Sequence, residues 1–334
     1  MSKTVFILDK FKGTLIGCAV GDALGAPVEG MPPEAILEEY GRVTDFIDAR
    51  FGTGRITDDT QMTITLAQSI IELGHLDVVH TGFKFARWMD LSERNVKEAR
   101  GVGKACGEAC RRLNSGAGPE ESGVDSAGCG AAMRASPAGL RFYHDLDGLR
   151  RASIEQARIT HTNSEAVAGA VAVAFVVARG ITDEGDLERA SLAGSAAKFV
   201  TDIDSSMAAR IAGLRDYLDA SPEEGFAYTG TGGYVMETVP AALFAFLRTP
   251  YYLEETVVTA VNAGGDTDSI GAIAGAISGS FNGLGALPAR WKDNVEGREY
   301  IEHLAQRLYT LTPAGKPRRV PLVASLGAAS PRQV

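Results

Sequence analysis

Two short acidic segments carry the side chains that catalysis or metal binding would need. The first is Thr-Asp-Asp-Thr at residues 57–60, and the second is Gly-Gly-Asp-Thr-Asp-Ser at residues 264–269. Each precedes an apolar stretch with helical spacing, so one polar residue in each could cap a helix. Both segments hold more carboxylates than a cap requires. Burying carboxylates costs free energy unless a cation compensates their charge, which predicts a divalent metal site.

The donor atoms in both segments are carboxylate and hydroxyl oxygens. Such ligands favour hard ions such as Mg²⁺ or Mn²⁺, and no CxxC or HExxH motif lies nearby to favour Zn²⁺. The spacing excludes an EF-hand calcium loop that begins at Asp266, because its twelfth residue is Ile277, where a bidentate Glu is required. A GxxxxGK[ST] phosphate loop is absent from the sequence.

Helices must position these segments. Between residues 59 and 73 the apolar residues recur mostly every three or four positions, and Gly74 follows as a C-cap. Convincing alternating strands are scarce, so we expect an all-α fold made of a single compact many-helix domain over residues 1–312. Residues 313–334, rich in Pro, Arg, Ala and Ser, are expected to form a flexible C-terminal tail. The same periodicity predicts helices at 33–40, 78–88, 99–113, 146–159, 164–178, 186–199, 205–218, 234–247, 252–261, 270–281 and 295–309.

Composition excludes several classes of protein. The 334 residues are 45% hydrophobic and 22% charged, which is typical of a soluble globular protein. The longest apolar run, residues 166–178, is shorter than the roughly 20 residues that a bilayer helix needs, and no signal peptide is recognised, so we expect a cytoplasmic protein without a membrane partner. The net charge of −9 argues against nucleic-acid binding.

Several motifs together resemble one known family. GCAVGDALGAPVEG from residue 17, ITDDTQM from residue 56 and AGGDTDSIGAIAGAISG from residue 263 look like the signature set of the ADP-ribosylglycohydrolase family, which includes bacterial dinitrogenase reductase-activating glycohydrolases. The resemblance continues through CGAAMRASPAGL, QARITHTNSEAV and GTGGYVMETVPAALFAF, so it covers roughly residues 13–288.

The resemblance implies an all-α domain with two Mg²⁺ or Mn²⁺ ions in a central cleft, which releases ADP-ribose from ADP-ribosylated proteins. The family's Glu, implicated in positioning or activating water, matches Glu29, the expected catalytic residue. The family's metal ligands match Thr57, Asp58, Asp59, Asp266, Asp268 and Ser269. Contacts with ADP-ribose are implied for Gly103, Gly128, Gly130, Met133, His161 and Tyr234.

One position departs from the pattern. Gly101 stands where we expect nitrogenase-regulating relatives to carry an Asp associated with the reacting sugar, and Asp90 or Glu98 would have to replace it. We expect hydrolysis of arginine-linked ADP-ribose by water attack at the anomeric carbon. Alternatives are hydrolysis of serine-linked ADP-ribose or O-acetyl-ADP-ribose, non-catalytic ADP-ribose binding as in crystallin-like members, and metal-dependent cleavage of the pyrophosphate.

Overall fold

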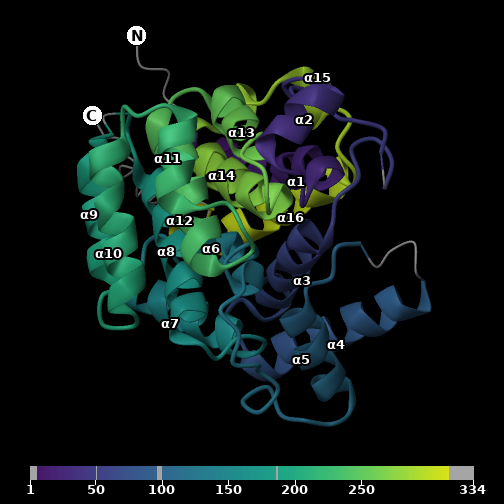
Figure 1. Ribbon diagram of the computed structural model, residues 1–334. Coiled ribbons are helices and arrows are strands. Elements are labelled where there is room, and N and C mark those ends of the chain that lie inside the picture. Colours follow the sequence, from purple (N-terminus) through teal and green to yellow (C-terminus); the bar gives the residue numbers. More distant parts are fainter. Residues whose placement is uncertain (1–5, 50, 96–99, 186, 316–334) are drawn as a thin grey trace, which may run out of the picture.

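The computed structural model describes residues 6–49, 51–95, 100–185 and 187–315, and Figure 1 shows that helices build nearly all of it. Within these ranges the only β structure consists of the isolated bridges Val124–His161 and Gly128–Tyr234. The predicted all-α single domain is therefore confirmed. Of the predicted tail, only the short η5 turn (Pro313–Gly315) is described, and residues 316–334 lie outside the described part of the chain.

The helices follow one another along the whole chain. The predicted segment at 33–40 matches its helix at both ends, and most other predictions differ by a few residues. In chain order the α-helices are α1 (Ile7–Gly25), α2 (Pro33–Tyr40), α3 (Asp58–Leu73), α4 (Val78–Arg94), α5 (Lys104–Asn114), α6 (Ser136–Phe142), α7 (Leu146–Arg158), α8 (Ser164–Thr182), α9 (Arg189–Val200), α10 (Ser205–Gly213), α11 (Pro222–Thr229), α12 (Val235–Arg248), α13 (Leu253–Val261), α14 (Thr267–Asn282), α15 (Ala289–Lys292) and α16 (Arg298–Thr310). The remaining 3₁₀ turns are η1 (Ala26–Val28), η2 (Cys129–Ala131), η3 (Leu214–Tyr217) and η4 (Leu284–Ala286).

Helices α1 and α14 lie antiparallel at the centre and touch through their backbones. A Cβ atom at Gly17 would lie 2.2 Å from the carbonyl oxygen of Gly275, and one at Gly21 would lie 1.9 Å from that of Gly271. Only glycine permits so close an approach. We call this contact the glycine interface; it consists of Gly13, Gly17, Gly21 and Gly25 of α1 and Gly271, Gly275 and Gly279 of α14. It sets the C-terminal end of α1 beside the N-terminal end of α14.

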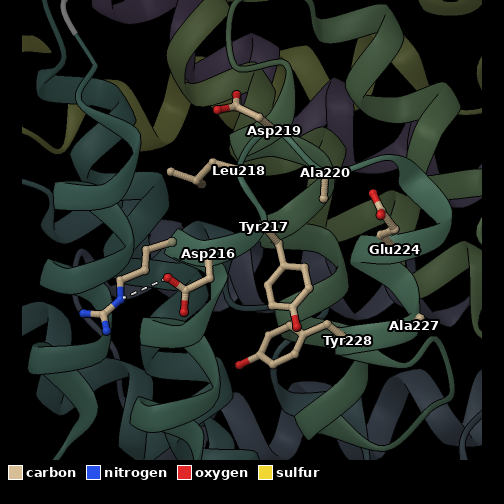
Figure 2. Close-up of a pocket in the computed structure, with 9 residues that line it drawn as sticks. Asp216, Tyr217, Leu218, Asp219, Ala220, Glu224, Ala227 and Tyr228 are labelled. Carbon is tan, nitrogen blue, oxygen red and sulfur yellow. Dashed lines mark ion pairs between the residues drawn. The ribbon is translucent and has the colours of Figure 1, made fainter.

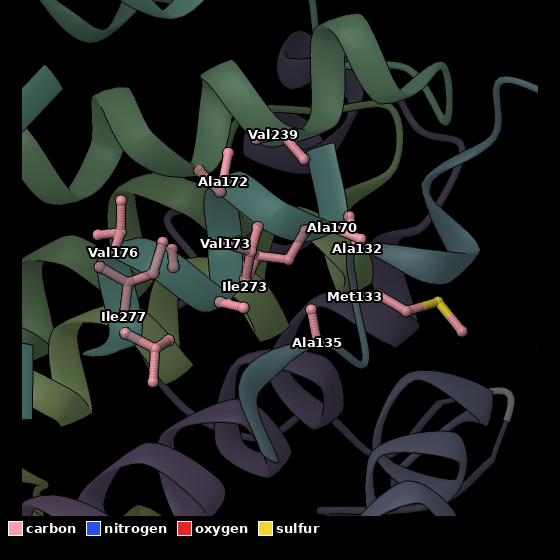
Figure 3. Packing of buried hydrophobic residues seen from close by; sticks show 14 of the residues in the cluster. Ala132, Met133, Ala135, Ala170, Ala172, Val173, Val176, Val239, Ile273 and Ile277 are labelled. Carbon is pink, nitrogen blue, oxygen red and sulfur yellow. The ribbon is translucent and has the colours of Figure 1, made fainter. Parts of the chain in front are cut away.

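Helix α8 forms the other part of the core. It packs against α6, α7, α12 and α14, and Figure 3 shows Val173 of α8 among Val239 of α12 and Ile273 of α14. By length and composition alone α8 could cross a membrane, but 83% of its most apolar window is buried inside the protein. That burial is typical of the core helix of a globular fold.

One departure from the predicted helices lies at the start of α5 and borders the first acidic segment. The helical periodicity predicts a start at residue 99, whereas α5 begins at Lys104. Gly101 has a φ of +77°, which no α-helix accommodates, and the peptide N–H of Asp58 donates to the carbonyl of Arg100 at 2.9 Å. Residues 100–103 therefore form a loop against the start of α3.

Candidate functional site

Three carboxylates from two separate segments meet at one point. Glu29 follows η1, Asp266 is the N-cap of α14, and Asp268 lies in its first turn. Each of the three side chains offers one carboxylate oxygen, and these three oxygens all lie within 4.8 Å of one another. This spacing suits oxygen ligands around a single divalent cation. The sequence predicted the two aspartates as ligands and Glu29 as a catalytic residue, and the structure adds Glu29 to the carboxylates that could hold a metal ion.

The glycines before α14 make the loop that joins these carboxylates. Gly265 has a φ of +72°, in the left-handed region that glycine adopts without strain. Its N–H donates to the carbonyl of Met31 at 3.0 Å, and its own carbonyl accepts from Gly30 at 2.7 Å. The next residue, Asp266, donates its N–H to Thr231 at 2.7 Å. The loop that carries Glu29 is thereby held against the start of α14.

The start of α3 is attached to α1 by a buried carboxylate that the sequence analysis missed. Asp22 accepts hydrogen bonds from the backbone N–H of Thr57 at 2.9 Å and from its hydroxyl at 2.8 Å. It also accepts from the N–H of Thr60 at 3.1 Å and from the Thr60 hydroxyl. The available signal was a single carboxylate within the apolar residues 13–25 of α1, because a buried carboxylate requires such partners.

Asp58 and Asp59 occupy the first turn of α3 and are both buried. Asp58 Oδ2 accepts from the N–H of Gly103 at 3.3 Å. Asp59 Oδ1 is buried and has no hydrogen-bond partner among the described residues. An unpaired buried carboxylate oxygen is strongly unfavourable, whereas a cation ligated by that oxygen would satisfy it. The residues present therefore fit a divalent cation.

Burial and mutual repulsion dominate the electrostatics of the cluster. Burial raises the pKa of Asp59 and Asp268 well above the usual value, and nearby carboxylates, Asp22 among them, raise both further. Burial likewise raises the pKa of Asp58. Burial raises the pKa of Asp22 to about 6, although the hydrogen bonds from Thr60 and Thr57 oppose this shift. A bound cation would favour the ionised form of every carboxylate that it contacts.

The predicted hydroxyl ligands lie beside these carboxylates. Thr57 is fully buried; its hydroxyl donates to Asp22 at 2.8 Å and accepts from the backbone N–H of Asp59 at 3.4 Å, which leaves one lone pair of its oxygen for another partner. Ser269 follows Asp268 directly and lies 3.5 Å, oxygen to sulfur, from Cys129, a neighbour that the sequence analysis did not predict. The Cys129 thiol also donates to Asp266 Oδ2 at 3.2 Å.

A second group of predicted residues gathers around the η2 loop. Gly128 pairs with Tyr234 in an antiparallel bridge, and a Cβ atom at Gly128 or Gly130 would lie 3.6 or 3.4 Å from His161 Nε2. Tyr234 is 44% exposed and donates its hydroxyl to Glu165 at 2.8 Å. Because the Cys129 thiol within η2 contacts Asp266, this group of residues adjoins the acidic cluster.

The two remaining predicted ADP-ribose contacts are Met133, whose N–H donates to the carbonyl of Cys129 in η2 at 3.0 Å, and Gly103. Met133 is buried, and Figure 3 shows it at the edge of the hydrophobic cluster. Gly103 borders the acidic cluster through its hydrogen bond to Asp58, and a Cβ atom there would meet no heavy atom within 4 Å. Met133 therefore supports the η2 loop from the hydrophobic core, and Gly103 faces open space beside α3.

The structure also explains the departure at Gly101. A Cβ atom at this position would lie 2.8 Å from Asp58 Oδ1, so a larger residue would displace that carboxylate. Of the substitutes considered, Asp90 forms an exposed ion pair with Arg94 at 3.0 Å, and Glu98 lies outside the described residues. The described contact of Asp90 therefore does not bring its carboxylate to the place of the missing one.

A separate surface pocket of about 850 Å³ lies between η3 and α11 (Figure 2). Tyr217 and Tyr228 stack there with their ring centroids 4.3 Å apart. Its described lining includes none of the residues predicted for the site. Tyr228 also borders a second pocket of about 500 Å³, whose lining includes Tyr234 of the predicted ADP-ribose contacts.

Comparison with known proteins agrees with the motifs. The model of the ADP-ribosylglycohydrolase family matches residues 3–318. The ADP-ribosyl-[dinitrogen reductase] glycohydrolase of Rhodospirillum rubrum is 30% identical over 292 residues, covering 86% of this chain and 90% of the relative. The ADP-ribosylarginine hydrolase Tri1 of Serratia proteamaculans is 29% identical over 315 residues, covering 92% and 80%.

The similarity extends to three-dimensional structure. A solved structure described as an ADP-ribosylglycohydrolase-related protein complex superposes with a TM-score of 0.75 at 30% identity, covering 91% of this chain and 98% of that one. The chain belongs to the ADP-ribosylglycohydrolase family, whose members are enzymes that hydrolyse glycosidic linkages of ADP-ribose.

Proposed function

We propose that the protein is a metal-dependent hydrolase that removes ADP-ribose from ADP-ribosylated protein side chains, with arginine-linked ADP-ribose as its substrate. The observation that carries this proposal is the meeting of Glu29, Asp266 and Asp268 within 4.8 Å, next to a buried Asp59 oxygen without a described partner. The activities for which the Rhodospirillum and Serratia relatives are named support the ADP-ribose chemistry and, for the latter, the arginine linkage.

Two Mg²⁺ or Mn²⁺ ions are the cofactors in this proposal. When bound, such ions orient hydroxyl groups of a sugar and act as Lewis acids on it. The donor set is entirely oxygen, as these ions prefer. The residues that would hold them are Thr57, Asp58, Asp59, Asp266, Asp268 and Ser269.

The remaining chemistry belongs to the chain's own groups. Cleavage at the anomeric carbon passes through an oxocarbenium-like state, so a water must be placed and deprotonated. A carboxylate oxygen of Glu29 takes the proton of this water, while the water oxygen bonds to the anomeric carbon. The bond between the anomeric carbon and the guanidino nitrogen breaks, and its electron pair goes to the nitrogen. Because the substrate guanidinium is cationic, it leaves as a neutral guanidine, which then takes up the proton held by Glu29. Backbone N–H groups near Gly128 and Gly130 would receive the pyrophosphate, because a net charge of −9 offers little general attraction for an anion.

A second candidate is supported by Gly101. The absence of a carboxylate at this position, and the lack of space for one beside Asp58, favour a substrate that does not need it. Serine-linked ADP-ribose and O-acetyl-ADP-ribose are the substrates of this second candidate.

One assay separates these functions. The protein with Mn²⁺ is incubated with peptides carrying arginine- or serine-linked ADP-ribose and with O-acetyl-ADP-ribose, and products are identified by mass spectrometry. Release of intact ADP-ribose from the arginine-linked peptide supports the first proposal, and release from only the other substrates replaces it by the second. Formation of AMP, or binding of ADP-ribose without any turnover, contradicts both. Asp266→Ala serves as the metal-site control and should abolish Mn²⁺ binding and turnover.

The role of Glu29 needs its own variant. Glu29→Gln should retain Mn²⁺ and lower kcat by about 10²–10⁴-fold, the range typical of a lost general base. Glu34→Gln, on the exposed first turn of α2, is the matched control and should behave as wild type. Wild-type turnover in Glu29→Gln would exclude the catalytic role. Loss of Mn²⁺ from this variant would instead make Glu29 a ligand, as its distance to Asp266 and Asp268 permits.

A further inference from the structure

A fully buried cation lies behind the η2 loop. Arg134 has no exposed surface, and its guanidinium stands over the ring of Phe85, 4.6 Å from the centroid. Its Nε donates to the Gln156 side chain at 2.9 Å, and Nη1 donates to the carbonyl of Gly130 at 2.8 Å. Nη2 donates to the Gln156 carbonyl at 3.0 Å and to the hydroxyl oxygen of Thr160 at 2.7 Å. The hydrogen-bond acceptors of Arg134 thus include the η2 loop and the residue before His161.

The hydroxyl of Thr160 links Arg134 to His161. Because a guanidinium can only donate, the Thr160 oxygen must accept from it, and the hydroxyl proton remains to be donated. His161 Nδ1 lies 2.8 Å from this oxygen. The other acceptor in range is the carbonyl of Ala157 at 3.5 Å, and it already accepts the backbone N–H groups of Thr160 at 3.0 Å and His161 at 2.8 Å. The hydroxyl proton therefore points to Nδ1, which must be unprotonated.

The surroundings of the ring agree with this assignment. A proton on Nδ1 would direct the positive end of its N–H bond toward the neighbouring Arg134. Burial lowers the pKa of His161 to about 3, and the charge of Arg134 contributes, so the imidazole is neutral. A neutral ring with an unprotonated Nδ1 carries its proton on Nε2. Among the described residues, no hydrogen bond reaches Nε2, which faces Gly128 and Gly130 of the predicted pocket.

We propose that Arg134 and Thr160 are positioning residues that hold His161 as its Nε2–H tautomer, which donates a hydrogen bond to an acceptor oxygen of the bound ligand. The ligand part of this proposal rests on the proposed function, in which a sugar diphosphate occupies the pocket, whereas the tautomer is a property of the protein alone. The pocket therefore offers His161 as a permanent neutral donor rather than as an acid or a base.

The tautomer can be measured directly by long-range ¹H–¹⁵N correlation spectra of protein with ¹⁵N-labelled histidine. His161→Gln assigns the signals among the five histidines of the chain. In wild type, Nδ1 should show the chemical shift of an unprotonated nitrogen and Nε2 that of a protonated one. Thr160→Val removes the donor and should move the Nδ1 signal, and Thr160→Ser should restore the wild-type spectrum. A proton on Nδ1 in wild type, or an unchanged spectrum in Thr160→Val, overturns the proposal.

Calorimetric titration of the Mn²⁺-loaded protein with ADP-ribose tests the ligand contact. Thr160→Val should bind ADP-ribose about tenfold more weakly, the size of one net hydrogen bond, with Thr160→Ser within about twofold of wild type. Both variants should bind Mn²⁺ as wild type does. Equal ADP-ribose affinity in all three proteins overturns the ligand contact. If wild type itself fails to bind ADP-ribose while the spectra are as expected, the proposed function fails and the tautomer stands.

Discussion

Gly25, the last residue of α1, touches the backbone of Asp268 in the first turn of α14: a Cβ atom at Gly25 would lie 2.6 Å from the Cα atom of Asp268. The same helix carries Asp22, whose carboxylate accepts from Thr57 and so fixes the start of α3. One helix therefore positions both acidic segments. Its close fit to α14 and its buried carboxylate are the properties on which metal binding should depend, and both can be tested.

Enlarging the glycine interface should destabilise the protein. A Cβ atom in Gly275→Ala would lie 2.1 Å from the carbonyl oxygen of Gly17, a contact that only backbone movement can relieve. We expect a loss of about 3 kcal/mol in the free energy of unfolding, at the upper end for overpacking. Urea denaturation measures it. Gly194→Ala in α9 is the matched control, because its Cβ would meet nothing within 4 Å and should stabilise by about 0.5–1 kcal/mol. Similar stability in both variants would contradict the proposed importance of the interface.

Removing one acceptor oxygen from Asp22 should loosen the start of α3. In Asp22→Asn, an amide NH₂ replaces an oxygen that now accepts from an N–H or hydroxyl of Thr57 or Thr60, so donors face each other. The expected loss is about 2–3 kcal/mol in the free energy of unfolding, measured from the midpoint of a urea transition of unchanged slope. Mn²⁺ affinity should fall as well. Thr60→Ser keeps the hydroxyl and should leave the free energy of unfolding and the Mn²⁺ affinity near wild type. If Asp22→Asn changes neither quantity, these hydrogen bonds do not support the site.

The metal-free protein should become less stable as pH rises through the weakly acidic range. The folded-state pKa of Asp22 is about 6, above its ordinary value near 3.8, so the folded protein binds more protons than the unfolded chain between these values. The protonated Asp22 carboxyl therefore contributes to the free energy of unfolding. This contribution is fully present below about pH 4 and is lost as pH rises through 6. Burial also raises the pKa of Asp58, Asp59 and Asp268, so each of them adds to the loss of stability in the same direction.

Bound Mn²⁺ should reverse that trend, because it favours the ionised carboxylates. The difference in Tm between protein with Mn²⁺ and protein with EDTA should therefore widen as pH increases from 5 to 8, and differential scanning calorimetry measures it. Exposed ion pairs elsewhere contribute equally to both samples and cancel in the comparison. A difference in Tm that stays constant over this range would contradict a site built from the buried carboxylates.

Gly101 should be intolerant of any side chain. In Gly101→Ala the residue keeps an unfavourable φ of +77°, and its Cβ would lie 2.8 Å from Asp58 Oδ1. We expect the Asp58 carboxylate, a ligand in the proposed metal site, to move and Mn²⁺ affinity to fall at least about tenfold, in addition to a backbone cost of about 1–2 kcal/mol. Gly103→Ala, whose Cβ enters open space, should keep wild-type Mn²⁺ affinity. Isothermal titration calorimetry with Mn²⁺ compares the two variants. Equal affinities would show that the Asp58 carboxylate does not depend on a glycine at position 101.

Much of the fold could be predicted because the local signals are strong. Pro33 opens α2 and Gly41 closes it, so both boundaries are visible in the sequence. Helix α11 was missed although Ser221 and Glu224 form a capping box before an aromatic residue, a signal that the sequence does contain. Helix α6 was missed because Pro137 near its start resembles a turn signal as much as a helix start.

The site could be predicted only where its ligands share a local motif. The aspartates at the starts of α3 and α14 can be recognised in the sequence because each segment holds more carboxylates than a helix cap requires. Asp22 and Cys129 belong to no local motif with their partners, which are distant in sequence: Asp22 contacts Thr57, and Cys129 contacts Asp266. The tautomer of His161 likewise depends on Arg134 and cannot be deduced from the ITHTN motif alone.

The glycine interface also determines when the site can exist. Gly17 leaves the ribosome early in synthesis, whereas its partner Gly275 emerges only after most of the chain has been made. Contacts this distant in sequence form slowly, since a long loop must close first. The nascent protein thus carries Asp22, Asp58 and Asp59 for most of its synthesis without Asp266 and Asp268, and the proposed metal site cannot be complete before α14 has been made.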